Sequence, residues 1–369
     1  MLELYFENNG NKRNVRFKDD IYEILDDARG VREKFWIVDN SSCNSRMLFK
    51  FNRNNVSCEN WGEVFASAIA RRINVPCVNY NLAQLFDENG NPLGKGVLCG
   101  TYKRSSKETE LSGYSLQTSY QNYTYDNSRG QQIEGLNTIN GFIEALQNNY
   151  QGRISPKELE NVRNDLLKQA IFDFILAQTD RHWLNTTFLL WEDDDSLHIR
   201  KAECYDNGCI AMLKRKASAV EGISREIEAQ GEDSPLLNHQ LSNYCPMMGV
   251  NSSLVIIDDK GKNPRDAERI RIANTQQGRE TFLKELSNEI IYNPEIAIFY
   301  KLLESKINDG SLMQNVMKDL ENAGDNPPLY VGKLVNEVMT HQLSTLDSYV
   351  HLAVDEAGKG FEEEEYADD

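Results

Sequence analysis

The sequence predicts an α+β fold with a small β-rich N-terminal lobe carrying one helix and a larger, mostly helical C-terminal lobe. Short apolar and aromatic runs with one helical repeat fill the first hundred residues, and long helical patterns dominate after about residue 136. A polar stretch separates the two regions. We therefore expect an N-lobe over residues 1–104, a polar linker or insertion over 105–135, a helical C-lobe over 136–353 and a disordered acidic tail over 354–369.

The N-lobe elements follow from local patterns. KFWIVDN (34–40) and RMLFKFN (46–52) are short and apolar, and a Ser-rich loop joins them, which predicts a β-hairpin. ENWGEVFASAIARRINV (59–75) repeats apolar residues at helical spacing. The stretch 77–104 contains two apolar runs around DENGNPLG, where Asn-Gly and Pro predict a turn between two strands.

The C-lobe is predicted to be helical with one hairpin. Helical patterns cover 138–150 and 155–178, and the second opens with Ser155 and Pro156, an N-cap followed by proline at the first helical position. TTFLLW (186–191) and SLHIRKAECYD (196–206) form two strands around the acidic turn EDDDS. Further helices are expected at 280–291, 295–307, 311–321 and 330–350.

Composition narrows the functional classes. The net charge of −17 argues against nucleic-acid binding, although the EEEE run of the acidic tail accounts for part of it. No stretch reaches 18 apolar residues, so no membrane span is expected. The seven cysteines include no CxxC, and the start lacks a signal-peptide pattern; we therefore expect a cytoplasmic protein, with delivery as an effector left open. Nothing in the sequence indicates an oligomeric state.

Three polar residues stand out at the end of the apolar helix 155–178 and its hairpin. Asp180 and Asn185 lie five residues apart between the helix and the first strand, and Asp206 follows the second strand. Because the strands fold back on each other, we expect the three side chains to converge. Phosphoryl transfer requires one carboxylate to orient the acceptor hydroxyl, and an amide oxygen with a second carboxylate to hold divalent ions.

Two N-lobe residues complete this set. Lys50 is the charged residue of an otherwise apolar strand segment, MLFKF, and Glu63 follows thirteen residues later in the predicted helix. A kinase needs such a lysine for the nucleotide phosphates and a carboxylate to hold it. The alternative is that Lys50 lies on the exposed face of its strand.

These motifs resemble those of kinases of the HipA and CtkA type and, more distantly, of the phosphatidylinositol 3- and 4-kinases. TDRHWLN followed by YDNG resembles their D-R-H-x-x-N catalytic loop and metal motif, and RMLFKFN, GEVFASAIARRINVPCVNY and GVLCGTYKR resemble the lysine strand, first helix and strand into the hinge. The likeness covers about residues 34–213 and implies a two-lobed protein-kinase-like fold.

The resemblance implies an ATP- and Mg²⁺-dependent (or Mn²⁺-dependent) kinase that transfers the γ-phosphate to Ser or Thr of a protein substrate. It implies roles for individual residues: Asp180 as the catalytic aspartate, His182 beneath the loop, Arg181 structural or near the phosphates, Asn185 and Asp206 as metal ligands, Lys50 as the phosphate-binding lysine with Glu63 as its partner, and Cys99, Gly100, Thr101 and Tyr102 at the adenine-binding hinge.

The loop expected to cover the phosphates departs from the usual pattern. It contains no glycine between residues 40 and 45, although glycine normally lets backbone N–H groups approach a phosphate. It offers Ser41, Ser42 and Ser45 instead. In HipA-type kinases a serine of this loop can be phosphorylated, which makes autophosphorylation here a hypothesis.

Other interpretations of the same residues remain open. Asp180, His182 and Asn185 form the kind of polar cluster that also caps a buried helix, and a nucleotide-binding pseudokinase or regulatory protein would use the same fold without turnover. The same site also suits AMP transfer or a small-molecule or lipid acceptor. A hydrolase lacks its G-x-S-x-G motif here, and the scattered histidines do not indicate zinc.

Overall fold

The computed structural model describes residues 1–9, 12–18, 20–25, 33–38, 46–53, 56–120, 138–181, 185–193, 196–230, 234–242, 244–246, 248–251, 255–258, 268–271 and 276–365. The chain forms two compact units, each assembled from separate stretches of sequence. Unit 1 comprises Met1–Thr109, Ala202–Ala229 and Gly310–Asn336, and unit 2 comprises Glu110–Lys201, Gln230–Asp309 and Glu337–Asp369.

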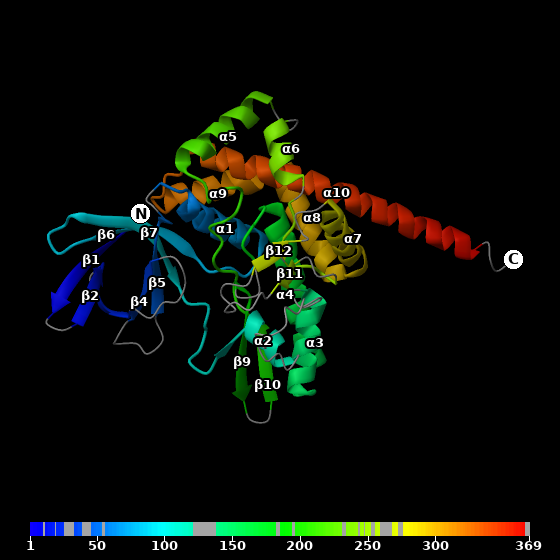
Figure 1. The fold of residues 1–369 in the computed structure, drawn as a ribbon, viewed down its shortest axis with the longest axis horizontal. Helices are drawn as coiled ribbons and strands as arrows, with labels where there is room; N and C mark the ends of the chain where they lie inside the picture. The colour runs from blue at the N-terminus through cyan, green and yellow to red at the C-terminus, as the bar shows by residue number, and fades with distance from the viewer. Residues whose placement is uncertain are drawn as a thin grey trace. The chain divides into compact units, whose positions relative to one another are not determined.

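Unit 1 is built on a closed β-barrel. Its strands are β1 (Leu2–Asn9), β2 (Lys12–Phe17), β3 (Asp20–Leu25), β4 (Lys34–Val38), β5 (Arg46–Phe51), β6 (Tyr80–Phe86) and β7 (Pro92–Gly100), in the order β1-β2-β3-β4-β5-β7-β6 (Figure 1). All neighbours are antiparallel except β1 and β6, whose parallel pairing closes the ring. The mixed α and β content agrees with the predicted class, but the expected small sheet is corrected to a barrel, because β1–β3 pair the sheet edges that a small sheet would leave open.

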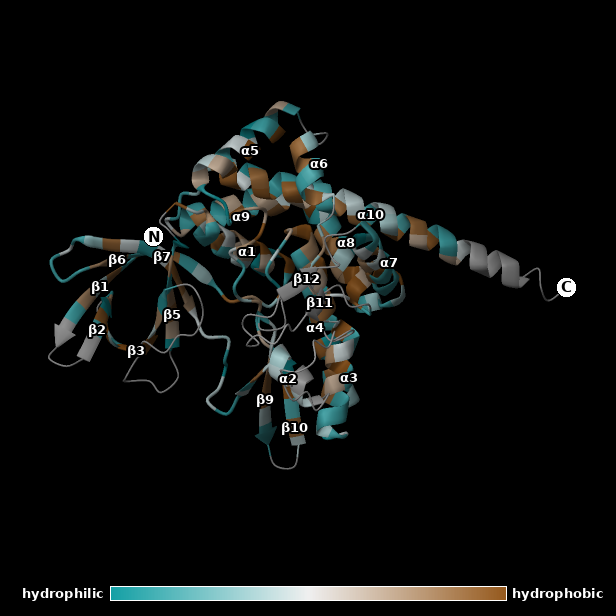
Figure 2. Cartoon of the chain, viewed as in Figure 1, coloured by the Kyte–Doolittle hydropathy of each residue, from teal (hydrophilic) through white to brown (hydrophobic). Residues whose placement is uncertain are grey.

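The barrel is filled by the alternate side chains of its strands. Leu4, Val15, Ile37, Phe49 and Leu85 are fully buried in one apolar cluster. Figure 2 shows hydrophobic residues along these strands, interrupted by hydrophilic ones. The predicted pairings of β4 with β5 and of β6 with β7 are confirmed.

Helix α1 (Glu59–Ile73) of unit 1 lies where a helix was expected. It contacts β6, β7 and α9 (Ser311–Asn322). Arg72 near its end donates to Asp319 of α9, with 2.7 Å between Nε and Oδ2. Unit 1 also holds α5 (Ala217–Gln230) and the first residues of α10 (Leu329–Glu365).

Unit 2 is organised around α4 (Pro156–Ile175), which contacts β10, α3, α7 and α8. A capping box begins α4, since Ser155 and Glu158 exchange side-chain and backbone hydrogen bonds as predicted for its N-terminus. The other elements are β8 (Thr109–Ser112), α2 (Gly113–Tyr120), α3 (Ile139–Tyr150), β9 (Thr187–Asp193), β10 (Ser196–Lys201), α6 (Pro235–Leu241), β11 (Val255–Asp258), β12 (Glu268–Arg271), α7 (Gln276–Tyr292) and α8 (Pro294–Asn308). The predicted β9–β10 hairpin is confirmed.

Two stretches have more regular structure than the sequence indicated. The stretch 105–135, expected to be a linker, contains β8 and α2. Helix α10 continues to Glu365, where a disordered tail from 354 was expected, because extending a formed helix adds one hydrogen bond for each residue fixed. Among the described residues, every helix is too short or too polar to cross a membrane.

A histidine joins the β9–β10 hairpin to the start of α4. His198 contacts Glu158 through Nδ1 at 2.8 Å and Asp193 through Nε2 at 2.7 Å, and its ring stacks on Trp191. The hydrogen bond to Asp193, followed by that to Glu158, raises the pKa of His198 above its ordinary value. Protonated His198 therefore stabilises this corner of unit 2.

Replacing His198 by Gln is expected to lower the melting temperature at acidic pH and to have little effect at alkaline pH. Because the folded-state pKa is raised, the stabilisation is fully present below the unfolded value of about 6.5 and is lost as the pH rises through the folded value. Thermal denaturation of both proteins from pH 5 to pH 9 would measure this, with His239→Gln, at an exposed position of α6, as control. A deficit that is independent of pH would contradict the prediction.

Candidate active site

Lys50 occupies the outer face of the barrel wall. Its neighbour Phe49 points into the barrel core, so alternation along β5 turns Lys50 the other way. The side chain is nevertheless only 4% exposed. The alternative of an exposed lysine is therefore wrong, and its charge requires partners.

Two carboxylates supply them. The ammonium nitrogen of Lys50 lies 2.8 Å from Oε1 of Glu63 on α1 and 2.8 Å from Oδ1 of Asp206. Glu63 is fully buried, and its second oxygen accepts a 2.6 Å hydrogen bond from the backbone N–H of Asn207. The pairing of Lys50 with Glu63 that the kinase pattern implies is present, and Asp206 of unit 1 is the second partner of the ammonium.

The turn that carries Asp206 lies directly against α1. Asp206 has a φ of 57°, a left-handed conformation that costs a non-glycine residue on the order of 1–3 kcal/mol. Gly62 and Gly208 allow the close approach, since a Cβ added at Gly62 would lie 2.7 Å from the carbonyl oxygen of Gly208. Gly62 lies one residue before Glu63, and Gly208 lies two residues after Asp206. The contact between the two glycines therefore sets the distance between the backbones that carry Glu63 and Asp206.

Tyr80 on β6 also contacts the turn that carries Asp206. Its hydroxyl accepts a 3.2 Å hydrogen bond from the backbone N–H of Asp206, and its ring lies 5.4 Å from the ammonium of Lys50. Burial, reinforced by the charge of Glu63, raises the pKa of Tyr80 well above its ordinary value, so the phenol stays neutral beside the cluster.

The predicted hinge residues lie at the end of β7, in the same unit. Burial raises the pKa of Cys99 to about 12, so its thiol stays protonated. Gly100 is exposed and has open space where a Cβ would lie. The ring of Tyr102 stacks on that of Tyr205, with 5.2 Å between the ring centroids, so Tyr102 lies next to the residue before Asp206.

In unit 2, a buried ion pair fixes the loop after α4. Arg181 is fully buried and donates to Asp173 of α4, at 3.0 Å from Nε and 3.3 Å from Nη2. A third nitrogen lies 3.4 Å from the carbonyl oxygen of Asn185. Of the two roles considered for Arg181, these contacts favour the structural one.

The same loop positions Asp180 and Asn185. The side-chain nitrogen of Asn185 donates to the carbonyl oxygen of Asp180 at 2.9 Å, which leaves its Oδ1 to accept a hydrogen bond or bind a cation. Both side chains are half-buried. Tyr244 braces the end of α4, with its hydroxyl 2.9 Å from the carbonyl oxygen of Asp173 and 2.7 Å from that of Gln178.

Some expected features are not tested. Asp180 and Asn185 belong to unit 2 and Asp206 to unit 1, so their convergence stays a prediction. His182 and the loop serines Ser41, Ser42 and Ser45 lie outside the described residues.

The charge balance of the unit 1 cluster suits a bound cation. One ammonium faces two carboxylates, which leaves one negative charge in excess, and the side chain of Asp206 is 38% exposed. A hard oxygen donor of this kind is what Mg²⁺ prefers. Within the described ranges, no group of three or more His, Cys, Asp or Glu side chains could hold a metal ion by itself, so other ligands would have to complete the shell.

Sequence reasoning missed several residues that build this site. Tyr80, Gly62 and Gly208 support the Asp206 turn, and Asp173 and Tyr244 support the loop of Asp180. Tyr80 alternates with its neighbours like any core aromatic, and Tyr244 lies far from the loop in sequence. The YDNG motif does contain Gly208, so its glycine is a signal that sequence analysis could have used.

Comparison with known proteins shows the fold. The chain matches a proinflammatory kinase, CtkA, of Helicobacter pylori at 15% identity with a TM-score of 0.56, over 90% of this chain and 96% of that one. It also matches the toxin–antitoxin complex of HipA, HipB and operator DNA from Shewanella oneidensis at 13% identity with a TM-score of 0.44, over 90% of this chain and 67% of that one. A third match is the structure of hydra Fam20 with sugar, at 14% identity with a TM-score of 0.28, over 75% of this chain and 84% of that one. No family model and no curated protein matches the sequence. The likeness to CtkA confirms the resemblance at the level of fold.

Replacing Gly62 by Ala should destabilise unit 1 by about 1–3 kcal/mol, because the new methyl group would overlap the Gly208 carbonyl. Gly222→Ala is the matched control, since Gly222 also lies inside a helix of unit 1 and a Cβ there meets no atom within 4 Å. The control should gain about 0.5–1 kcal/mol from helix propensity. Urea denaturation of both variants measures the difference, and equal stabilities would contradict the close approach.

Replacing Arg181 by Met should destabilise unit 2 by about 3–5 kcal/mol, because Asp173 would keep a buried charge without its partner. The double variant Arg181→Met, Asp173→Leu removes both charges and should recover most of the loss. Denaturant unfolding of the three proteins tests this. A double variant no more stable than the single one would show that the ion pair is not the source of the effect.

Proposed function

We propose that this chain is a kinase that uses ATP and Mg²⁺ to transfer the γ-phosphate to a hydroxyl group, with Ser or Thr of a protein as the acceptor. The observation that carries the proposal is the buried ammonium of Lys50, held at 2.8 Å by Glu63 and at 2.8 Å by Asp206. A buried lysine without partners would be costly at this position. The exposed part of the cluster is the carboxylate of Asp206, whose side chain is 38% exposed.

The residues of unit 1 would bind the nucleotide. Lys50 would contact the α- and β-phosphates, with Glu63 fixing its direction, and Asp206 would be a ligand of the metal ion. Bound Mg²⁺ would supply charge neutralisation for the phosphates. The backbone at Gly100 to Tyr102 would hydrogen-bond the base, since no side chain at Gly100 blocks the approach.

The residues of unit 2 would act on the acceptor. Asp180 would orient the hydroxyl and accept its proton as the phosphoryl group is transferred, and Oδ1 of Asn185 would bind the metal. The Arg181–Asp173 pair would fix the loop without touching the substrate. In this scheme the rate enhancement comes from positioning and charge stabilisation. The fold shared with the kinase CtkA supports it.

A catalytically inactive nucleotide-binding protein is the second candidate. The sequence contains all five residues that the proposed kinase site requires, namely Lys50, Glu63, Asp180, Asn185 and Asp206, and this favours the enzyme. AMP transfer and other acceptors would use the same metal and phosphate groups.

Incubation with ATP labelled at the γ-phosphate, with Mg²⁺ and a generic protein acceptor, is expected to transfer label to the acceptor or to the chain itself. Asp180→Asn and Asp206→Asn should each reduce transfer about a hundredfold or more, the scale for removing a group that stabilises the transition state. Asp20→Asn, on the exposed start of β3, should have no effect.

The position of the label separates the candidates. Transfer from ATP labelled at the α-phosphate, but not at the γ-phosphate, would replace the kinase by an AMP transferase. Nucleotide binding that depends on Asp206 without any transfer would favour the inactive protein. Transfer that persists in both Asp variants would disprove the assignment of the site.

A further inference from the structure

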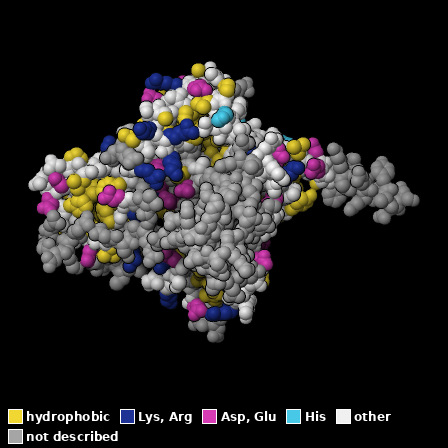
Figure 3. Space-filling model, in the orientation of Figure 1, with side chains coloured by type: hydrophobic (Ala, Val, Ile, Leu, Met, Phe, Trp, Pro, Cys, Tyr) yellow, Lys and Arg dark blue, Asp and Glu magenta, His cyan; other side chains and the backbone are white. Residues whose placement is uncertain are grey.

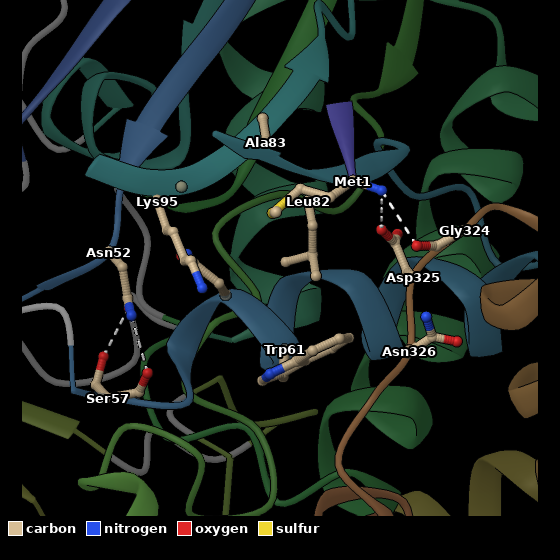
Figure 4. Close-up of a pocket in the computed structure, with 12 residues that line it drawn as sticks. Met1, Asn52, Ser57, Trp61, Leu82, Ala83, Lys95, Gly324, Asp325 and Asn326 are labelled. Carbon is tan, nitrogen blue, oxygen red and sulfur yellow. Dashed lines mark hydrogen bonds and ion pairs between the residues drawn. The ribbon is translucent and has the colours of Figure 1, made fainter. Parts of the chain in front are cut away.

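A pocket of about 300 Å³ lies in unit 1, between α1 and the strands β6 and β7. It is separate from the Lys50 cluster. Figure 4 shows Leu82 and Lys95 reaching from the strands toward the helix, where Trp61 lies across from them. The turn at residues 324–326 forms the far wall.

The apolar part of the pocket is preformed. Trp61 and Leu82 are both half-buried, and Ala83 is buried behind them. The ring of Trp61 packs edge-on against Phe65 at 6.4 Å, which fixes its orientation. A planar or branched apolar group could enter without displacing these side chains.

Most polar groups of the pocket already have partners. The side chains of Asn52 and Ser57 hydrogen-bond to each other at 2.9 Å, and the carboxylate of Asp325 lies 3.1 Å from the amino nitrogen of Met1. Lys95 differs from them. Its side chain is exposed, and no ion pair or hydrogen bond from its ammonium occurs in the part of the chain that the structure describes.

Further positive charge lies next to Ser57, one of the residues that line the pocket. Ser57 forms a β-bridge with Lys216, which ends a run of exposed cations that begins at Lys214. Figure 3 shows Lys and Arg side chains gathered over the part of unit 1 that contains α1, α5 and α9. This is unusual in a chain of net charge −17. The pocket therefore combines an apolar slot with neighbouring cations.

We propose that this pocket is a docking site for a segment of a partner protein in which an aromatic side chain is flanked by acidic residues. The aromatic group would fill the slot beside Trp61 and Leu82. The acidic groups would pair with Lys95 and with the cations that begin at Lys214. Charge complementarity of this kind also accelerates the encounter of the two proteins.

Docking would act on nucleotide binding, an effect that rests on the proposed function. Trp61 lies two residues before Glu63 on α1, on a different face of the same rigid helix. A ligand against Trp61 that fixes α1 also fixes Glu63 beside Lys50. Bound peptide and ATP should then strengthen each other's binding by the same factor.

Fluorescence anisotropy with the labelled peptide Ac-DDFDD-amide tests the docking site without ATP. The full chain is expected to bind it, and Lys95→Glu should weaken binding about tenfold by replacing attraction with repulsion. Asn326→Trp fills the pocket from an exposed position and should abolish binding without unfolding the protein. Lys107→Glu, an exposed lysine of unit 1 that does not line the pocket, is the control for charge and should bind like the wild type.

Three results would overturn the docking site: no binding of Ac-DDFDD-amide by the wild type, equal binding of Ac-DDADD-amide, or equal loss in Lys95→Glu and Lys107→Glu. The coupling is tested by repeating the titration with saturating Mg²⁺ and ATP. A tighter peptide Kd supports the link through α1, and an unchanged Kd in a protein that binds ATP refutes it. Failure to bind ATP would disprove the proposed function and leave the docking result standing.

Discussion

One ammonium group shared by two carboxylates joins three distant parts of the chain. Lys50 comes from β5, Glu63 from α1 and Asp206 from the segment after β10. The ammonium nitrogen of Lys50 lies 2.8 Å from a carboxylate oxygen of each of the other two residues. The barrel must present β5 with Lys50 facing outward, and α1 must lie close enough for Glu63 to contact it. Because a buried charge without a partner costs several kcal/mol, β5 and α1 cannot separate without leaving the charge of Glu63 buried and unpaired.

Each unit contains buried side chains of opposite charge in contact, but the two sets differ in exposure and charge balance. In unit 1 the excess carboxylate of Asp206 stays partly exposed, so the cluster is open to a cation. In unit 2 the pair of Arg181 and Asp173 is balanced and sealed, with side chains 0% and 1% exposed. A buried ion pair contributes little net stability compared with apolar residues of the same volume. We infer that its role in unit 2 is to hold Arg181, and through it the backbone carbonyl of Asn185, at a fixed place beside α4.

Much of this arrangement could be predicted from the sequence, and there are physical reasons why the remainder could not. The strands β4–β7 and helix α1 follow from periodicity and turn residues, and the pair of Lys50 with Glu63 follows from the kinase pattern that the sequence resembles. The closure of the barrel does not, because the parallel pairing of β1 with β6 joins residues about 80 positions apart and leaves no local pattern. Arg181 lies in a run that resembles a catalytic motif, and the sequence does not show its burial against Asp173, the contact that favours a structural role.

The interleaving of the two units has a consequence for biosynthesis. A ribosome that has released the first 200 residues has released the whole barrel and α1, yet Asp206, α9 and the start of α10 are still to come. Domains generally complete folding only when all their segments are present, and long-range contacts form late. Lys50 and Glu63 therefore lack their third partner, Asp206, until more than half of the chain has been synthesised, so a product truncated before residue 206 would contain the barrel without the complete Lys50 cluster.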